Sequence, residues 1–427
     1  MDLLAVIAIL LGLTALFGVL NERYLGLQST IGLMLLALLT AVLFGILKAT
    51  GVVENLGWED ALVKQLDLSE VLLNGVLCFM LFAGSAGVKI EGLKENKWVV
   101  VTLAIGSTIL ACALIGVLLH FSLAWFGITL ALTYAFVFGA LISPTDPIAA
   151  LAILKSVGLP KPLEDIINGE SLFNDGVGVV LFTVAMAFAS GSSEMGVGDS
   201  VALFLREVLG GVSLGLLVGL VSHVMLLRTQ DFTNQLMITL ATVALGYSVA
   251  LHVEVSGPIA MVVAGIFVGN VTAPRIPEKV LLPVRTFWQG IDELLNSLLF
   301  VMLGFVIVLV HNLELAPLVI SIPLAVVVCL AARAISVYLP LALLSATPAL
   351  NANRNRMTAL LTWGGLRGGL AFALALSLPD SPEKPLLVNM TYGVVAVSIL
   401  FQGSTIGKLF KPDFLNSILK SGQAKTP

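Results

Sequence analysis

The chain has 427 residues, of which 58% are hydrophobic and only 11% are charged, with a formal net charge of −4. A soluble domain has about 25% charged residues, so this composition excludes an ordinary soluble protein and indicates a chain embedded in a membrane. Without a basic patch, the sequence does not favour nucleic acid as a partner. The three cysteines lie inside apolar stretches, which is not the pattern of a disulfide framework.

Polar residues divide the chain into apolar stretches of the length that crosses a bilayer, which is about 20 residues. The first begins after Met1-Asp2, without a basic region before it or a cleavage site after it, and is read as a retained helix. The sequence predicts an all-α polytopic membrane protein with about thirteen spans, near residues 3–20, 27–47, 70–90, 98–119, 129–155, 163–190, 200–227, 232–251, 257–273, 287–310, 317–345, 354–378 and 386–410.

The basic residues of the loops predict the orientation, because Lys and Arg concentrate in short cytoplasmic loops. With thirteen spans and a cytoplasmic C-terminus, sixteen of the 22 basic residues lie inside and four lie outside. The other two, Arg333 and Arg367, fall within spans. This asymmetry favours an external N-terminus, and a cytoplasmic tail at 411–427.

The fifth span contains Ser143-Pro-Thr-Asp-Pro147 in an otherwise apolar stretch. Proline removes a backbone donor and breaks a helix, so carbonyl groups are set free beside Thr145 and Asp146. A carboxylate next to free carbonyls suits a small, hard cation. The alternative is a simple proline kink with a paired Asp146.

The sixth span contains Gly169-Glu-Ser-Leu-Phe-Asn-Asp-Gly176. Glu170 and Asn174 are four residues apart, as are Ser171 and Asp175, so the two rows form one polar helix face. Ionisable groups at this depth cost at least ~2.5–3.5 kcal/mol, which favours a functional site over a purely structural hydrogen-bonded cluster.

Two further charges, Arg333 and Arg367, lie in the eleventh and twelfth spans. A structural role for each, as a charge that holds helices together, is the favoured interpretation. Glycines surround Arg367 and weaken its helix. With Asp146, Glu170 and Asp175 ionised, the five embedded charges leave one negative charge, which one monovalent cation or one proton would neutralise.

The positions of the interruptions predict an internal repeat. When spans 1–6 are paired with spans 8–13, the broken fifth span corresponds to the twelfth. Span 7 is then a connector, and because six spans plus this connector precede the second half, that half crosses the membrane in the opposite direction to the first. Inverted repeats with discontinuous helices that meet at the midplane are typical of transporters.

These motifs resemble the monovalent cation–proton antiporter family of the NhaP and NHE type. The matching segments cover nearly the whole chain in order: Phe79–Gly84, Ser143–Pro147, Gly169–Gly176, Ser256-Gly257 with Gly265 and Gly269-Asn270, Ala332–Ala334 and Gly364–Gly368. The Asn174-Asp175 pair together with the Thr-Asp-Pro break is the most specific part of the resemblance.

The resemblance implies a role for each embedded residue. Asp175 would bind the ion or proton, Asp146, Ser171 and Thr145 would complete a Na⁺ site, and Glu170 would contribute through water. Asn174 would hold the broken helix. Arg333 would pair with Glu170, and Arg367 would brace the second broken helix. Asn174 and Arg333 also favour electroneutral one-for-one exchange, because an aspartate and often a lysine stand there in electrogenic relatives.

The resemblance also implies an organisation and a location. A mobile core, approximately 98–190 and 317–410, would move against a dimerisation part, approximately 1–97 and 200–310. The expected partners are membrane lipid and a second copy of the chain, in a prokaryotic cell membrane. No cofactor is implied; Na⁺ (or Li⁺) and H⁺ are the expected substrates.

Other classes remain open from the sequence. A K⁺/H⁺ antiporter would have the same architecture, and a cation channel or ion-coupled solute transporter would also have many spans. A membrane-embedded enzyme would need a nucleophile–base pair or a metal cluster within the spans, and no such motif is evident in the sequence.

Overall fold

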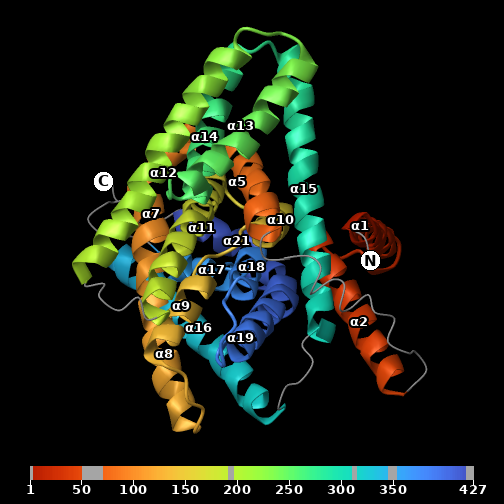
Figure 1. The fold of residues 1–427 in the computed structure, drawn as a ribbon, viewed down its shortest axis with the longest axis vertical. Coiled ribbons are helices and arrows are strands. Elements are labelled where there is room, and N and C mark those ends of the chain that lie inside the picture. The colour runs from red at the N-terminus through yellow and green to blue at the C-terminus, as the bar shows by residue number, and fades with distance from the viewer. Residues whose placement is uncertain (1–2, 51–70, 191–196, 310–314, 345–352, 420–427) are drawn as a thin grey trace.

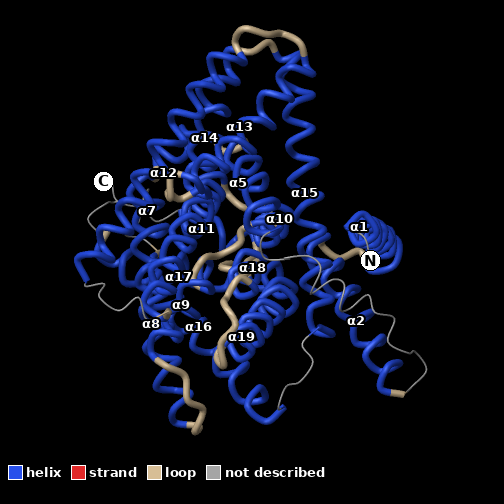
Figure 2. Tube along the Cα trace, viewed as in Figure 1, coloured by secondary structure: helices blue, strands red, loops and turns tan. Residues whose placement is uncertain are grey.

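The computed structural model describes residues 3–50, 71–190, 197–309, 315–344 and 353–419, and within these ranges the regular elements are all helical (Figures 1 and 2). In this described part, nine helices are long and apolar enough to cross a membrane, and two shorter apolar helices, Leu77–Ala86 and Leu132–Ile142, accompany them. The predicted all-α membrane fold is therefore confirmed. The count of thirteen spans and the inverted repeat stay predictions.

The helices follow one another along the chain as follows. The first half contains α1 (Leu3–Leu20), α2 (Ser29–Ala49), α5 (Leu77–Ala86), α6 (Ile90–Glu95), α7 (Lys97–Val101), α8 (Thr108–Trp125), α9 (Leu132–Ile142), α10 (Ile148–Ser156) and α11 (Lys161–Ala189). The second half contains α12 (Val197–Leu226), α13 (Phe232–His252), α14 (Gly257–Phe267), α15 (Glu278–Leu309), α16 (Leu315–Leu343), α17 (Arg354–Trp363), α18 (Gly369–Leu376), α19 (Lys384–Val397), α20 (Ser404–Leu409) and α21 (Pro412–Leu419). Short π-helical segments, such as η6 (Ser398–Gly403), continue several of them.

Helices occupy each predicted span, and the two predicted interruptions are present. The fifth span is divided into α9 and α10 by residues 143–147, and the twelfth into α17 and α18 by residues 364–368. The described part of the tail forms α21, while 420–427 and most of the 48–69 loop lie outside the described residues.

The start of α15 differs from the prediction, because the helix begins at Glu278 and not near residue 287. Its first turns carry polar residues, which the apolar pattern excludes from a span. Leu281, Val284 and Trp288 are nevertheless buried, and the ring of Trp288 lies 4.9 Å from that of Phe82. Tertiary packing on α5 therefore extends the helix beyond its apolar stretch.

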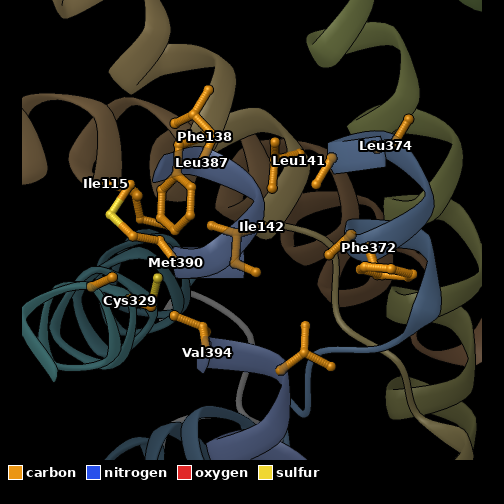
Figure 3. Packing of buried hydrophobic residues seen from close by; sticks show 14 of the residues in the cluster. Ile115, Phe138, Leu141, Ile142, Cys329, Phe372, Leu374, Leu387, Met390 and Val394 are labelled. Carbon is orange, nitrogen blue, oxygen red and sulfur yellow. The ribbon is translucent and has the colours of Figure 1, made fainter. Parts of the chain in front are cut away.

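The largest buried cluster anchors the first helix break. Side chains of α8, α9, α16, α18 and α19 pack together, including Ile115, Phe138, Cys329 and Met390 (Figure 3). Leu141 and Ile142, the last residues of α9, are fully buried in this cluster. The end of α9, where the break begins, is therefore held in a fixed position.

A glycine allows α11 to approach that break. A Cβ atom at Gly178 would overlap the ring of Pro144. Neither the proline ring nor the helix backbone can move freely. The packing therefore requires glycine, which has only a hydrogen atom as its side chain, at position 178. Gly178 therefore sets the distance between the broken helix and the polar face of α11.

We predict that Gly178→Ala destabilises the protein by about 1–3 kcal/mol, the usual cost of overpacking. The measurement is the melting temperature of the purified protein in detergent. Gly18→Ala in α1 is the control, because a Cβ there meets nothing within 4 Å and alanine favours the helix. Equal melting temperatures for Gly178→Ala and wild type would contradict the packing requirement.

Candidate functional site

The two helix breaks lie against each other. The backbone N–H of Asp146 donates to the carbonyl of Leu366 at 2.8 Å, so a residue of the first break is bonded to a residue of the second. The backbone N–H of Arg367 donates to Ser398 Oγ at 2.9 Å. Backbone groups released by the breaks are thus satisfied inside the protein, as a membrane requires.

The side chain of Arg367 satisfies the carbonyl groups of the first break. Its Nη1 donates to the carbonyl oxygens of Ser143, at 2.5 Å, and Pro144, at 2.9 Å. In an unbroken helix, the Ser143 carbonyl would accept from residue 147, which is a proline without an N–H. The resemblance implied that Arg367 braces the second broken helix; its guanidinium bonds the carbonyls of the first, so this residue of the second break ties the two breaks together.

Asp146 is held at the start of α10. Its Oδ1 accepts from the N–H of Ile148 at 2.9 Å. A Cβ at Gly368 would overlap the Asp146 carboxylate, so the second break has to present a glycine here. The carboxylate is thereby fixed between the two breaks.

The polar face of α11 reaches the first break through Thr145. Asn174 Nδ2 donates to Thr145 Oγ1 at 2.9 Å, and the hydroxyl of Ser171 lies 3.4 Å from the same oxygen. The link between Asn174 and the broken helix, which the resemblance implied, is present. Thr145 faces these two side chains and is itself buried.

Glu170 and Arg333 form a buried ion pair. Arg333 Nη2 lies 2.5 Å from Glu170 Oε1, and both side chains are 2% exposed. This is the pairing that the resemblance implied. Arg333 Nε also donates to the carbonyl of Leu361 at 3.4 Å. The pair joins α11 to α16 and to α17. Because Glu170 is engaged by Arg333, Asp146 and Asp175 are the two predicted carboxylates that have no basic partner among the described residues.

A cavity of about 430 Å³ leads to the remaining carboxylates. Asp146, Ser171 and Asp175 line it, and neither aspartate forms an ion pair with another described residue. At one end, the cavity is lined by charged residues that surround the start of α11, namely Lys155, Lys161, Glu164 and Asp165. Lys161 bonds Glu164 and Asp165, and Lys155 bonds Glu164, at 2.9–3.1 Å.

The cavity also includes a residue that the sequence reasoning missed. Asp292 of α15 lines it together with Asp146 and Asp175. It lies within the predicted tenth span, at 287–310, so the cost of an embedded charge was the signal that could have identified it.

The arrangement offers hard oxygen ligands: two carboxylates and a hydroxyl beside a broken helix. Such ligands suit alkali or other hard cations. Among the described residues, no group of three or more His, Cys, Asp and Glu side chains is placed to hold a metal ion. Two carboxylates in one cavity repel each other when both are ionised, and a bound cation or proton relieves that repulsion.

Comparisons with known proteins identify the family. The family model described as "Sodium/hydrogen exchanger, transmembrane" matches residues 6–411. The chain is 37% identical to the Na⁺/H⁺ antiporter NhaP of Pseudomonas aeruginosa, over 99% of each chain. It is 34% identical to the Na⁺/H⁺ antiporter NhaH of Halobacillus dabanensis, over 83% of this chain and 86% of that one.

The fold is shared as well. The structure of the sodium proton antiporter MjNhaP1 from Methanocaldococcus jannaschii at pH 8 matches with a TM-score of 0.75 at 18% identity, over 98% of each chain. The protein therefore belongs to the sodium/hydrogen exchanger family, and it is a multi-pass membrane protein of that fold.

We predict that Arg333→Leu alone destabilises the protein by about 3–5 kcal/mol, because it leaves a buried carboxylate without its partner. Adding Glu170→Gln to this variant removes the uncompensated charge. The double variant should therefore melt at a higher temperature than Arg333→Leu alone, measured in detergent. Strictly additive losses from the two substitutions would show that the pair contributes no coupling.

Proposed function

We propose that this protein is a secondary antiporter that exchanges Na⁺ (or Li⁺) for H⁺ across a prokaryotic cell membrane. The observation that carries the proposal is the pair Asp146 and Asp175, which line one cavity without a basic partner among the described residues. A cation and a proton would compete for these carboxylates, so that binding of one releases the other. The relatives named as Na⁺/H⁺ antiporters support the same substrates.

The proposed site has two layers. Asp175 and Asp146 bind the ion or proton directly, with Ser171 supplying a hydroxyl oxygen from the same cavity. Thr145, which the resemblance assigned to the Na⁺ site, is not among the residues that line this cavity; its hydroxyl accepts from Asn174, and we assign both residues to holding the broken helix. Glu170 is held by Arg333. We therefore assign Glu170 a supporting role, in which it contacts the cation only through a water molecule. This assignment makes the protein a transporter that uses its embedded acids for ion exchange and not an enzyme.

The proposed mechanism is alternating access. The core, approximately 98–190 and 317–410, contains both breaks, the polar face of α11 and Arg333. We propose that it moves against the part formed by approximately 1–97 and 200–310, through which two copies form a dimer. With the C-terminus cytoplasmic, the cavity mouth at Lys155 and Lys161 faces the cytoplasm.

The charge distribution supports electroneutral exchange. The Glu170–Arg333 pair is neutral as a unit, and Arg367 contributes one positive charge at the breaks. Together with Arg367, Asp146 and Asp175 leave one net negative charge at the breaks when both are ionised; Asp292 belongs to α15, outside the proposed core, and is not part of this count. One Na⁺ or one proton neutralises this charge, so each form of the loaded site carries the same charge.

We predict that Asp175→Ala abolishes exchange, because the main competing carboxylate is lost. In proteoliposomes with an imposed pH gradient, addition of Na⁺ should dissipate the gradient through the wild type and not through the variant. Asp413→Ala is the control, since Asp413 is an exposed acid on α21. Undiminished exchange by Asp175→Ala would overturn the site assignment, and K⁺-driven dissipation in place of Na⁺ would favour the K⁺/H⁺ alternative.

We further predict that the exchange rate is independent of membrane potential. The measurement imposes a potassium diffusion potential with valinomycin across the same proteoliposomes and compares Na⁺-driven proton flux with and without it. A severalfold change in rate would contradict one-for-one exchange. Sodium current without any proton flux would instead indicate a channel.

A further inference from the structure

Asp292 places a carboxylate of α15 on the wall of the cavity that the broken helices also line. It belongs to α15, which lies outside the two segments that form the proposed core, and it lines the same cavity as Asp146 and Asp175. Leu299, two turns further along α15, lines that cavity too, and a Cβ at Gly369 would overlap it. This face of α15 is therefore turned toward the ion pathway.

The Asp292 side chain is held in place by its own helix. Asn296, four residues later and 5% exposed, donates through Nδ2 to the Asp292 carboxylate at 3.2 Å and to the Asp292 carbonyl at 2.8 Å. The amide oxygen of Asn296 has no hydrogen-bond partner among the described residues. A carboxylate and an unused amide oxygen, both ligands that alkali cations accept, thus lie together one helical turn apart.

No basic residue neutralises Asp292 within the part of the chain that the structure describes. The lysines at the cavity mouth are already engaged, Lys155 by Glu164 and Lys161 by Glu164 and Asp165. The exposed Lys89, which also lines the cavity, makes no ion pair with Asp292. The negative charge of Asp292 therefore acts on the ions that enter the cavity, where low-dielectric walls focus its field.

We infer that Asp292 is a cation-collecting residue on the stationary wall of the pathway, which raises the local Na⁺ concentration and passes the ion to Asp146 and Asp175. This rests on the proposed antiport function. Because Asp292 lies outside the proposed mobile core that carries the two receiving carboxylates, the residue assists loading on the cavity side only. Its removal slows capture of the ion and leaves the exchange step intact.

The test compares Asp292→Asn with wild type in Na⁺-driven proton flux through proteoliposomes. The substitution preserves the shape of the side chain and an oxygen acceptor for Asn296. We expect the KM for Na⁺ presented at the cavity side to rise about three- to tenfold, as for loss of one focusing charge, with the maximal rate within about twofold of wild type. Asp292→Glu keeps the charge and should have the KM of the wild type. Asp292→Ser removes the charge and has a smaller side chain, and it should raise the KM as much as Asp292→Asn does.

Glu293→Gln is the matched control, because Glu293 is the next residue of the same helix but is exposed and does not line the cavity. It should leave the KM unchanged. An unchanged KM in Asp292→Asn, or an equal increase in Glu293→Gln, overturns the inference. A fall in the maximal rate at constant KM overturns it as well, since that result indicates a structural role.

A binding measurement separates this inference from the proposed function. The Na⁺ concentration that gives half-maximal thermal stabilisation of the detergent-purified protein should rise in Asp292→Asn by a similar factor. Wild-type protein that exchanges no Na⁺ for H⁺ refutes the proposed function. Equal half-maximal concentrations in wild type and Asp292→Asn refute the role of Asp292.

Discussion

The structure depends on how two interrupted helices satisfy their backbone in the middle of a membrane protein. Each break releases carbonyl and N–H groups that have no water to bond. In an apolar environment, each unpaired group would cost roughly several kcal/mol. The Asp146–Leu366 backbone bond and the bonds from Arg367 to Ser143 and Pro144 resolve this problem by joining the two breaks. The same bonds fix Asp146, so the solution to a folding constraint also places a carboxylate for chemistry.

The embedded charges divide into two groups by their partners. Glu170 and Arg333 pair with each other, and Arg367 bonds the backbone carbonyls of the first break; these bonds connect α11 to α16 and one break to the other. Asp146, Asp175 and Asp292 face the cavity without a basic partner among the described residues. An unpaired carboxylate at membrane depth is costly, and a transported cation or proton is what offsets that cost.

Local chemistry made part of this predictable from the sequence. Pro144 and Pro147 remove backbone donors wherever they stand, and the i, i+4 spacing of Glu170 and Asn174 places them on one face of any helix. The partner of Arg367 could not be predicted, because it depends on how two distant segments cross. The role of Asp292 was missed for a similar reason: whether an acid on α15 faces lipid, a neighbouring helix or the pathway depends on the rotation of that helix. The early start of α15 likewise follows from packing on α5, which hydropathy does not encode.

The central claim is that Na⁺ and H⁺ compete for Asp146 and Asp175. The most direct test measures protons released when Na⁺ is added to purified protein in weakly buffered solution, alongside the amount of Na⁺ bound. The account predicts saturable release of about one proton per bound sodium ion, since a metal ligand has to give up its proton to bind, and no release from Asp175→Ala. Saturable Na⁺ binding by the wild type without proton release would contradict it.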